Sequence, residues 1–368
     1  MFEIKVNKKQ LLPALLIVSG AVDRKQSLPI LANVVLKVVG NKLFLTATDL
    51  EIEITANITC ESLQGDGSIT APAKKFVDII RSLDDEATPT LKTDDKNLLI
   101  NNGRSRFKLS TLSAQDYPST DIEDSDAVFD LQKDNLIDLL QSTHFALSQQ
   151  DIRAFLNGLL LEIEKNVITT VGMDGHRMAI YRIPTKVNCD NQRVIIPRRG
   201  VHELLRLLNN SEDDMVRVSV GKNHIKILAQ DYVFISKLIE SRFPAYNKAI
   251  PKCHDKRMVI STDALKRAIM RITILANEKS RAIKLSIDDN LLTIIANNPE
   301  QEEAYEEISA KTEGDSLKIA VNASYLLDVL NYLAADTVNL SFGDTNSSIL
   351  VEALNKPEYL YVIMPMKI

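Results

Sequence analysis

The clearest pattern in the chain is one amphipathic segment that occurs three times. Apolar residues at relative positions 0, 3, 4 and 7 form one face of an α-helix, and this spacing occurs over residues 72–83, 197–208 and 322–333, with 125 residues between successive copies. The matching residues are Phe76, Ile79, Ile80 and Leu83, then Val201, Leu204, Leu205 and Leu208, and finally Leu326, Val329, Leu330 and Leu333. The pattern predicts three equivalent helices and therefore a threefold repeat.

The segments around these helices recur in the same order. Each copy begins with a short alternating strand and another amphipathic helix, and further alternating runs typical of strands follow. Gly40-Asn41 separates two such runs and indicates a hairpin. Pro13 is expected early in the first helix, where its missing N–H matters least. Two helices on a mostly antiparallel sheet in each copy predict the α+β fold class.

The repeats predict three domains, an N-terminal one at 1–125, a central one at 126–253 and a C-terminal one at 254–368. They meet near 117–126, which is polar and acidic, and near 243–254, which contains two prolines. Both segments are interpreted as linkers.

Composition narrows the function classes. No apolar run is long enough to span a bilayer, and the first residues lack the order of a secretory signal, so we expect a cytoplasmic protein. The cysteines Cys60, Cys189 and Cys253 are too far apart for a zinc site or a disulfide framework, and no cofactor is expected. The net charge of −5 argues against nucleic-acid binding unless the basic residues are segregated.

Basic residues are in fact segregated on the repeated helices. Arg199, His202 and Arg206 fall opposite the apolar face of the middle helix, and Lys74, Lys75 and Arg81 do so in the first copy. The third copy differs, because it has no basic residue and carries Asp328. A solvated helix face is the simpler interpretation of any one helix, but the recurrence favours an electropositive wall. No aromatic residues interleave with the charges, so stacking on single strands is not expected and sequence-independent contact with duplex phosphates remains.

One local cluster resembles a catalytic site. Asp174 and His176 lie two residues apart and could exchange protons, but Asp174-Gly175 is also a turn signal between two strands. Because the other two repeats hold different residues in this place, we interpret it as a tight turn. The chain lacks the phosphate-binding, nucleophile-elbow and zinc-protease motifs, and the protein is predicted not to be an enzyme.

These residues together resemble a known family, the bacterial DNA polymerase III β subunits, which are sliding clamps. The stretches that carry the resemblance, spread over the whole chain in the family's order, are SLPILANVVL, TATDLEIEI, RSRFKLSTL, FLNGLLLEI, MDGHRMA, PRRGVHELLRLL, SRFPAY, ILANEKSRAIKL, ANNPEQEEAYEEI, YLLDVLNYL and YVIMPMKI. The resemblance implies a DNA clamp fold with three repeated domains. It also implies a homodimer whose two chains close head-to-tail into a ring, with helices lining the hole and sheets outside.

The resemblance implies a processivity factor that encircles double-stranded DNA without reading its sequence. A mildly basic lining in an acidic protein suits this role, since tight phosphate contacts would stop sliding. The residues expected near DNA are Arg24, Lys25, Lys74, Arg81, Gln150, Arg198, Arg199 and Arg206.

Ring closure would join the first repeat of one chain to the third repeat of the other. The residues expected at this dimer interface combine basic, apolar and acidic side chains: Arg104, Arg106, Phe107, Ile274, Leu275, Glu300, Glu302, Glu303 and Glu306. The simpler interpretation of the glutamate run is a solvated segment.

The family binds its replicative polymerase catalytic subunit, its clamp loader, and other polymerases and repair proteins through short peptides. The residues that match the family's peptide pocket are Leu156, Met173, Gly175, His176, Arg177, Pro244, Lys248, Asn322, Tyr325, Ser348, Val362, Met364, Pro365 and Met366. A Met-rich terminus suits several partners because thioether side chains adapt to different surfaces, whereas a plain edge strand would explain only its Val and Ile. Lys248 stands where many relatives have Arg, Ala249 replaces a larger apolar residue, and Lys367-Ile368 replaces Arg-Leu, which puts the peptide preference in doubt.

Two other functions stay open from the sequence. The first is a repeat-built peptide scaffold that never encloses DNA. The second is a hydrolase centred on Asp174 and His176.

Overall fold

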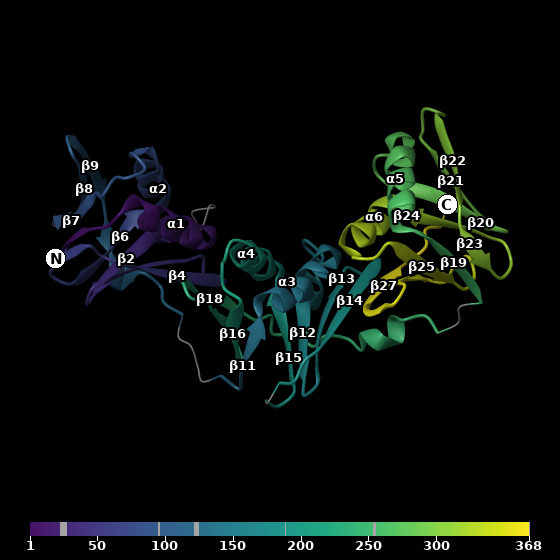
Figure 1. The fold of residues 1–368 in the computed structure, drawn as a ribbon, viewed down its shortest axis with the longest axis horizontal. Coiled ribbons are helices and arrows are strands. Elements are labelled where there is room, and N and C mark those ends of the chain that lie inside the picture. The colour runs from purple at the N-terminus through teal and green to yellow at the C-terminus, as the bar shows by residue number, and fades with distance from the viewer. Residues whose placement is uncertain (23–27, 95, 121–124, 188, 253–254, 368) are drawn as a thin grey trace. The chain divides into compact units, whose positions relative to one another are not determined.

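The computed structural model describes residues 1–22, 28–94, 96–120, 125–187, 189–252 and 255–367. Internal contacts divide the chain into two compact units. The first comprises Met1–Asp134 and Arg199–Leu238, and the second comprises Asn135–Arg198 and Ile239–Ile368. The central repeat therefore contributes strands and helices to both units (Figure 1).

The first unit contains two antiparallel sheets. The smaller has the spatial order β5 (Ser62–Gln64), β1 (Glu3–Lys5), β7 (Thr90–Asp94), β8 (Asn97–Asn102) and β9 (Ser105–Ser110). The larger has the order β10 (Leu112–Ser113), β6 (Gly67–Pro72), β2 (Asn33–Val39), β3 (Lys42–Thr48), β4 (Ile52–Thr59), β18 (Tyr232–Lys237), β17 (His224–Leu228), β16 (Met215–Val220) and β11 (Ala127–Gln132). The predicted hairpin at Gly40-Asn41 is confirmed, because Val39 pairs with Lys42 across it and Gly40 has φ +58°.

Three helices pack in the first unit: α1 (Lys8–Val18), α2 (Ala73–Ser82) and α4 (Arg198–Asn209), whose first residue belongs to the other unit. The side chain of Asn7 accepts a hydrogen bond from the N–H of Lys9 and caps α1. Pro13 is the sixth of the eleven residues of α1, so its expected place early in the helix is wrong. The buried stripe that includes Leu11 and Leu15 sets where α1 lies and outweighs the hydrogen bond that a proline cannot donate.

The second unit also contains two antiparallel sheets. The larger has the order β15 (Gln192–Pro197), β12 (Gly158–Glu164), β13 (Val167–Met173), β14 (Arg177–Pro184), β27 (Lys356–Ile363), β26 (Ile349–Ala353), β25 (Thr337–Phe342), β19 (Lys256–Ser261) and β23 (Lys311–Glu313). The smaller has the order β22 (Glu303–Ser309), β21 (Leu291–Asn297), β20 (Ala282–Asp288) and β24 (Leu317–Asn322). Both units therefore show the α+β class with antiparallel sheets that the sequence predicts.

The helices of the second unit are α3 (Lys133–Gln141), which begins in the first unit, α5 (Thr262–Ile272) and α6 (Ala323–Tyr332). Side-chain oxygens of Ser261 and Asn322 accept backbone N–H groups and cap α5 and α6. Short 3-10 helices complete the chain: η1 (Ser19–Ala21), η2 (Pro29–Ala32), η3 (Ala114–Asp116), η4 (His144–Ala146), η5 (Ala154–Asn157), η6 (Tyr246–Ala249) and η7 (Thr273–Leu275).

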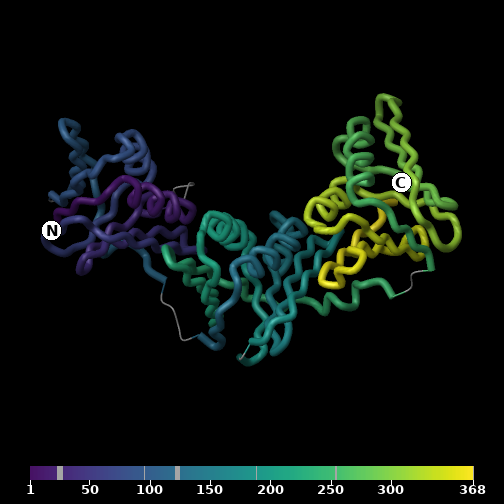
Figure 2. Tube along the Cα trace, in the orientation of Figure 1, coloured from purple at the N-terminus to yellow at the C-terminus, as the bar shows by residue number. Residues whose placement is uncertain are grey.

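Each nine-stranded sheet joins two repeats through one antiparallel strand pair. In the first unit β18 pairs with β4, so that Phe234 lies opposite Ile54. In the second unit β27 pairs with β14, so that Tyr361 lies opposite Ala179. Figure 2 follows these returns of the chain, with β18 beside β4 and the C-terminal strand β27 beside β14. Phe234 and Tyr361 are both fully buried, so each joint is built around an aromatic side chain.

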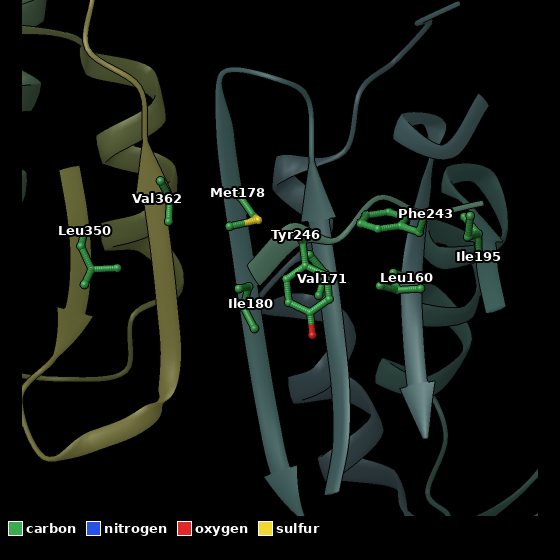
Figure 3. Close-up of a cluster of buried hydrophobic side chains, with 9 residues drawn as sticks. All are labelled: Leu160, Val171, Met178, Ile180, Ile195, Phe243, Tyr246, Leu350 and Val362. Carbon is green, nitrogen blue, oxygen red and sulfur yellow. The ribbon is translucent and has the colours of Figure 1, made fainter. Parts of the chain in front are cut away.

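The segments interpreted as linkers begin with packed aromatic residues. The Tyr117 hydroxyl donates to the Asn33 carbonyl at 3.1 Å and accepts from the Thr48 N–H at 3.0 Å. Phe243 and Tyr246 are buried against strands of the second unit (Figure 3). Polar residues and prolines around them suggested a free connection, but burial of the rings fixes the start of each segment.

Among the described residues, no helix is long and apolar enough to cross a membrane. The same residues contain no group of three or more His, Cys, Asp or Glu side chains that could hold a metal ion.

Candidate functional site

The predicted turn between β13 and β14 is present. The Asp174 carboxylate accepts hydrogen bonds from the N–H groups of His176 and Arg177, at 2.9 and 3.0 Å. Gly175 has φ +90°, a backbone conformation that disfavours residues with a side chain. The Asp174 carboxylate is thus occupied by the turn and by Arg177, and it shapes the backbone here.

Arg177 links this turn to helix α6. Its guanidinium forms ion pairs with Asp174 at 3.1 Å and with Asp328, and it donates to the Phe145 carbonyl at 2.6 Å. It also lies 4.5 Å from the centre of the Tyr325 ring, a cation–π distance. Only 11% of the side chain is exposed. These contacts explain why the third repeated helix carries Asp328, because the carboxylate receives the guanidinium of the turn.

Aromatic rings continue from Arg177 into the unit. Phe145 stacks on Tyr332 with ring centres 5.1 Å apart and planes within 1° of parallel, and it also contacts Tyr361. His144 meets the edge of Tyr332 at 5.3 Å. Burial lowers the pKa of His144, and the nearby Arg198 lowers it further, against the opposing effects of the Gln141 carbonyl and Asp328. The neutral imidazole is therefore favoured in this cluster.

Below the turn lies a cluster of buried apolar side chains drawn in Figure 3: Leu160, Val171, Met178, Ile180, Ile195, Phe243, Tyr246, Leu350 and Val362. Two residues that match the family's pocket, Leu156 and Val362, are 0% and 4% exposed. In this structure both side chains are buried, and neither forms part of an accessible surface.

The accessible part of the predicted pocket is more polar. His176, Pro244, Lys248 and Met364 are exposed, and the half-buried members are Met173, Gly175, Arg177, Asn322, Tyr325, Ser348, Pro365 and Met366. The His176 ring stacks on Tyr325 at 6.3 Å. The structure thus places all of the predicted pocket residues in the second unit.

Two backbone hydrogen bonds hold the C-terminal segment across this region. The Met364 N–H donates to the His176 carbonyl at 2.9 Å, and the Met366 N–H donates to the Ala320 carbonyl at 2.8 Å. The segment therefore runs from the Asp174 turn to strand β24. The methionine side chains between these bonds are positioned without being fully packed, since 48% of Met364 is exposed.

The residues expected near DNA have different environments. Lys74 and Arg81 are exposed on α2, with Arg81 at 3.6 Å from Asp78, and Gln150 is exposed between η4 and η5. Arg198 is half-buried at the start of α4. Arg24 and Lys25 lie outside the described residues.

Arg199 and Arg206 of α4 have partners in the first repeat. Arg206 donates to the Ile17 carbonyl at 2.8 Å, and Arg199 donates to the Gly20 carbonyl at 3.3 Å. Both carbonyls belong to the C-terminal end of α1 and the turn after it, where a cation is favourable. Arg206 also pairs with Glu203, and Arg199 with Asp49. Their side chains remain 39% and 43% exposed, so they join two repeats and still face solvent.

The residues expected at the dimer interface, apart from Ile274 and Leu275, lie on or just before the outer strands of two sheets. Arg106 and Phe107 are on β9, which is the last strand of the five-stranded sheet, and Arg104 is in the turn before it. Glu303 and Glu306 are on β22, the last strand of the four-stranded sheet, with Glu300 and Glu302 in the loop before it. Ile274 is 77% exposed in η7, and Leu275 is half-buried. Glu306 already pairs with Arg271 of the same chain.

Sequence reasoning missed three residues that shape the pocket: Phe145, Tyr332 and Arg153. The Phe145 ring makes a cation–π contact with the Arg177 guanidinium, and Tyr332 of α6 stacks on Phe145. No spacing in the sequence links these residues. Arg153 is held by Asp151 at 2.9 Å, and its guanidinium lies so near Gly175 that an added Cβ would be 3.1 Å away. The pair Asp151 and Arg153, two residues apart before the FLNGLLLEI stretch, was the only available signal.

Comparison with known proteins covers the whole chain. Family models described as the N-terminal, central and C-terminal domains of the DNA polymerase III beta subunit match residues 2–121, 130–245 and 247–367. The beta sliding clamp of Pseudomonas putida is 43% identical over 364 residues, and that of Escherichia coli is 40% identical over 363 residues; each alignment covers 99% of both chains.

Solved structures of sliding clamps are also similar to this chain over its full length. The DNA polymerase III subunit beta of Pseudomonas aeruginosa is similar with a TM-score of 0.96 and 39% identity, over 99% of this chain and 100% of that one. A Pseudomonas aeruginosa sliding clamp bound to griselimycin has a TM-score of 0.96 and 40% identity, with both chains fully covered. Since all three domain models match and full-length relatives are up to 43% identical, this chain belongs to the DNA polymerase III beta subunit family, the beta sliding clamps.

Proposed function

We propose that two copies of this chain close head-to-tail around duplex DNA and tether the replicative polymerase, the clamp loader and repair proteins through short peptides in the bacterial cytoplasm. The observation that carries this proposal is the full-length match to sliding clamps in all three domains. The protein is a processivity factor and performs no chemistry itself.

The two closed joints support a specific dimer. Equivalent backbone hydrogen bonds precede the joining strand in each repeat: Asp49 N–H to Ile52 O, Asp174 N–H to Arg177 O, and Asn298 N–H to Glu302 O. Two residues beyond each acceptor are Ile54, Ala179 and Ala304. Ile54 and Ala179 lie opposite the buried aromatic residues Phe234 and Tyr361. Ala304, on the free edge β22, lacks such a partner in the described part of its own chain.

Phe107 on the other free edge fits that place. It is the third residue of β9, as Phe234 is the third residue of β18, but it is only half-buried. We expect β22 of one copy to pair antiparallel with β9 of the other, with Ala304 opposite Phe107. In this register Arg104 falls opposite Glu307, and Lys108 opposite Glu303. Opposite charges at the two edges would guide the pairing.

The proposed DNA contact is weak and diffuse. Lys74 is exposed, whereas Arg81, Arg199 and Arg206 are already paired with carboxylates. Paired arginines attract phosphates less than free ones, and diffuse attraction of this kind permits sliding. Arg24, Lys25, Gln150 and Arg198 complete the proposed lining.

The proposed peptide pocket lies in the second unit, over the buried cluster and between the Asp174 turn and the C-terminal segment. A related clamp from Pseudomonas aeruginosa, 40% identical over its full length, has been solved with griselimycin bound. We therefore propose that griselimycin and clamp-binding peptides also bind this chain, at His176, Tyr325, Met364 and the residues around them. The exposed Lys248 at the rim would favour peptides with a nearby acidic residue.

Loading onto closed and open DNA tests the proposal. The clamp, labelled on an exposed residue, is loaded by its clamp loader onto a nicked circular plasmid, and half of the sample is then linearised with a restriction enzyme. A ring stays on the circle and slides off the linear ends. Equal retention on both forms would contradict encirclement and would support a scaffold that binds peptides without enclosing DNA.

A further inference from the structure

A second groove lies beside the C-terminal segment, on one face of the four-stranded sheet. It encloses about 650 Å³. Strands β20, β21 and β24 form its floor, and the loop at Thr345 and Asn346 and the terminal residues Met366 and Lys367 form one side. All of these residues belong to the second unit.

The charged side chains of this groove are all positive. Lys284, Lys318 and Lys367 are exposed, and within the described residues none of the three has an ion-pair partner. No residue lining the groove is acidic. The contrast with the arginines of the predicted sites is clear, because Arg177, and likewise Arg199, is neutralised by a carboxylate of its own chain.

Strand register places polar groups between the lysines. Ser286 lies opposite both Thr293 and Lys318, and in the next row on the same face Lys284 lies opposite Ile295 and Ala320. Hydroxyl groups and ammonium groups are therefore adjacent across three strands. Such a surface can donate hydrogen bonds to carboxylates and offers apolar contact at Ile295 and Ala320 for the chain that carries them.

The groove is continuous with the proposed peptide pocket. Met366 lines the groove and also belongs to the pocket, and its N–H is bound to the Ala320 carbonyl at the groove's floor. A peptide that leaves the pocket past Met366 would reach Lys367 next. Asp344, the nearest acidic residue in sequence to the lining loop, accepts hydrogen bonds from the N–H of Asn346 and the hydroxyl of Ser347, and its carboxylate is a negative charge beside this loop.

We propose that this groove binds an acidic stretch of the partner chain that directly adjoins its clamp-binding peptide. The inference rests on the proposed peptide pocket and adds a charge preference outside it. Carboxylates beside the lysines limit the attraction. Glu307 lies opposite Thr293 at the edge of the same face, where the Tyr305 hydroxyl donates to it, and Asp288 follows Ser286 on the same face of β20. The charged side chains that line the groove itself are the three lysines, so partners with glutamate or aspartate beside their binding motif gain affinity.

Fluorescence anisotropy with matched peptides tests this inference. The probes carry the clamp-binding segment of the polymerase III catalytic subunit from the same organism, extended at either end by four glutamates or by four serines. At about 50 mM salt, where surface charges are weakly screened, the glutamate extension at one end should lower the Kd for the intact clamp by roughly five-fold, as expected for a few exposed charge pairs.

The double variant Lys284→Gln/Lys318→Gln should remove this advantage and leave the affinity for the serine-extended peptide unchanged. Lys252→Gln/Lys311→Gln, which changes the charge equally at exposed lysines outside the groove, should keep the advantage. Equal affinity of the two extended peptides for the intact clamp would overturn the inference while the pocket assignment stands.

Two further outcomes identify other causes. If neither peptide nor griselimycin binds, the pocket assignment fails and the groove inference fails with it. If the groove variant instead weakens binding of a labelled duplex of about 30 base pairs while the glutamate advantage persists, the lysines serve nucleic-acid phosphates, and the acidic-peptide inference is overturned.

Discussion

The guanidinium of Arg177 lies 4.5 Å from the centre of the Tyr325 ring and pairs with Asp328 on the same helix. One side chain of the β13–β14 turn thereby holds helix α6. At the corresponding joint of the first unit the polarity is reversed, because the arginine, Arg199, is on the helix and the carboxylate, Asp49, is in the turn. Each joint between repeats therefore has an ion pair between turn and helix. The arginine belongs to the turn in one joint and to the helix in the other.

Replacing Arg177 should destabilise the second unit. Arg177→Ala leaves Asp328 and the partly buried Asp174 without their cation, and we expect a loss of about 2–4 kcal/mol in the free energy of unfolding. Arg153→Ala removes a more exposed ion pair nearby and should lower the free energy of unfolding much less. Urea unfolding followed by tyrosine fluorescence measures both, since the chain has no tryptophan and seven of its nine tyrosines lie in this unit. Equal losses in the two variants would show that Arg177 has no special role.

Replacing Phe107 should open the ring. Phe107→Ala removes the aromatic side chain proposed to fill each dimer joint, and an anchor of this kind contributes about 2–4 kcal/mol. The dimer dissociation constant, measured by sedimentation equilibrium, should rise at least about thirty-fold. Leu228→Ala changes an apolar residue that is 41% exposed on an interior strand of its sheet and should leave the dimer intact.

Removing residues 364–368 should abolish peptide binding and keep the dimer. The deletion takes away the methionines of the pocket and the hydrogen bonds to His176 and Ala320, while β27 ends at Ile363 and stays paired with β14. Isothermal titration with griselimycin and sedimentation report the two properties separately. Normal griselimycin affinity in the truncated protein would refute the pocket assignment.

Mild acid should weaken the second unit through His144. Burial lowers the pKa of its imidazole below the ordinary value of about 6.5, so the unfolded chain binds a proton at a higher pH than the folded one. The contribution of His144 to the free energy of unfolding is therefore fully present when the pH is above its pKa in the unfolded chain. This contribution falls as the pH drops toward its lower pKa in the folded protein. Urea midpoints near neutral pH and about one to two pH units lower should differ more for the intact protein than for His144→Gln. The same difference in both proteins would assign the pH effect to other groups.

Basic residues of the proposed lining should separate into two classes. Lys74→Ala should weaken the clamp's salt-sensitive attraction to DNA and reduce the slope of log affinity against log salt by about one for each lost phosphate contact, without changing stability. Arg206→Ala should also destabilise the first unit, because it leaves the Glu203 carboxylate and the Ile17 carbonyl without their donor. Thermal unfolding alongside DNA binding distinguishes the two effects. An unchanged melting temperature for Arg206→Ala would mean that its contacts with α1 contribute little.

Repetition made much of the fold predictable. The apolar spacing at Val201, Leu204, Leu205 and Leu208 places one face of α4 in the core, and all four residues are buried. The same spacing of apolar residues occurs in α2 and α6. The three equivalent helices and the antiparallel strands around them therefore follow from the sequence. Local rules also identified the turn at Asp174-Gly175.

Side-chain partners were less predictable, because they come from distant parts of the chain. Arg206 was assigned to a free basic face by its position on the helix, yet its guanidinium contacts the end of α1, 189 residues earlier. The Glu203 carboxylate lies against Gly20, where a Cβ would be, an approach that no local pattern encodes. The position of Pro13 in the middle of α1 was also not predicted. Packing of α1, and not proline chemistry, decided where the helix begins.

The sequence alone determined the threefold repeat, the α+β class and the family, because hydrophobic periodicity and motif order are written locally and recur. The tertiary structure decided which charges are free and which are paired. Arg177 and Arg199 are neutralised across the joints, whereas Lys284 and Lys318 remain available on a sheet face that the sequence did not single out. Such pairing depends on distances between residues that are far apart in the chain, and these distances exist only once the strands have joined.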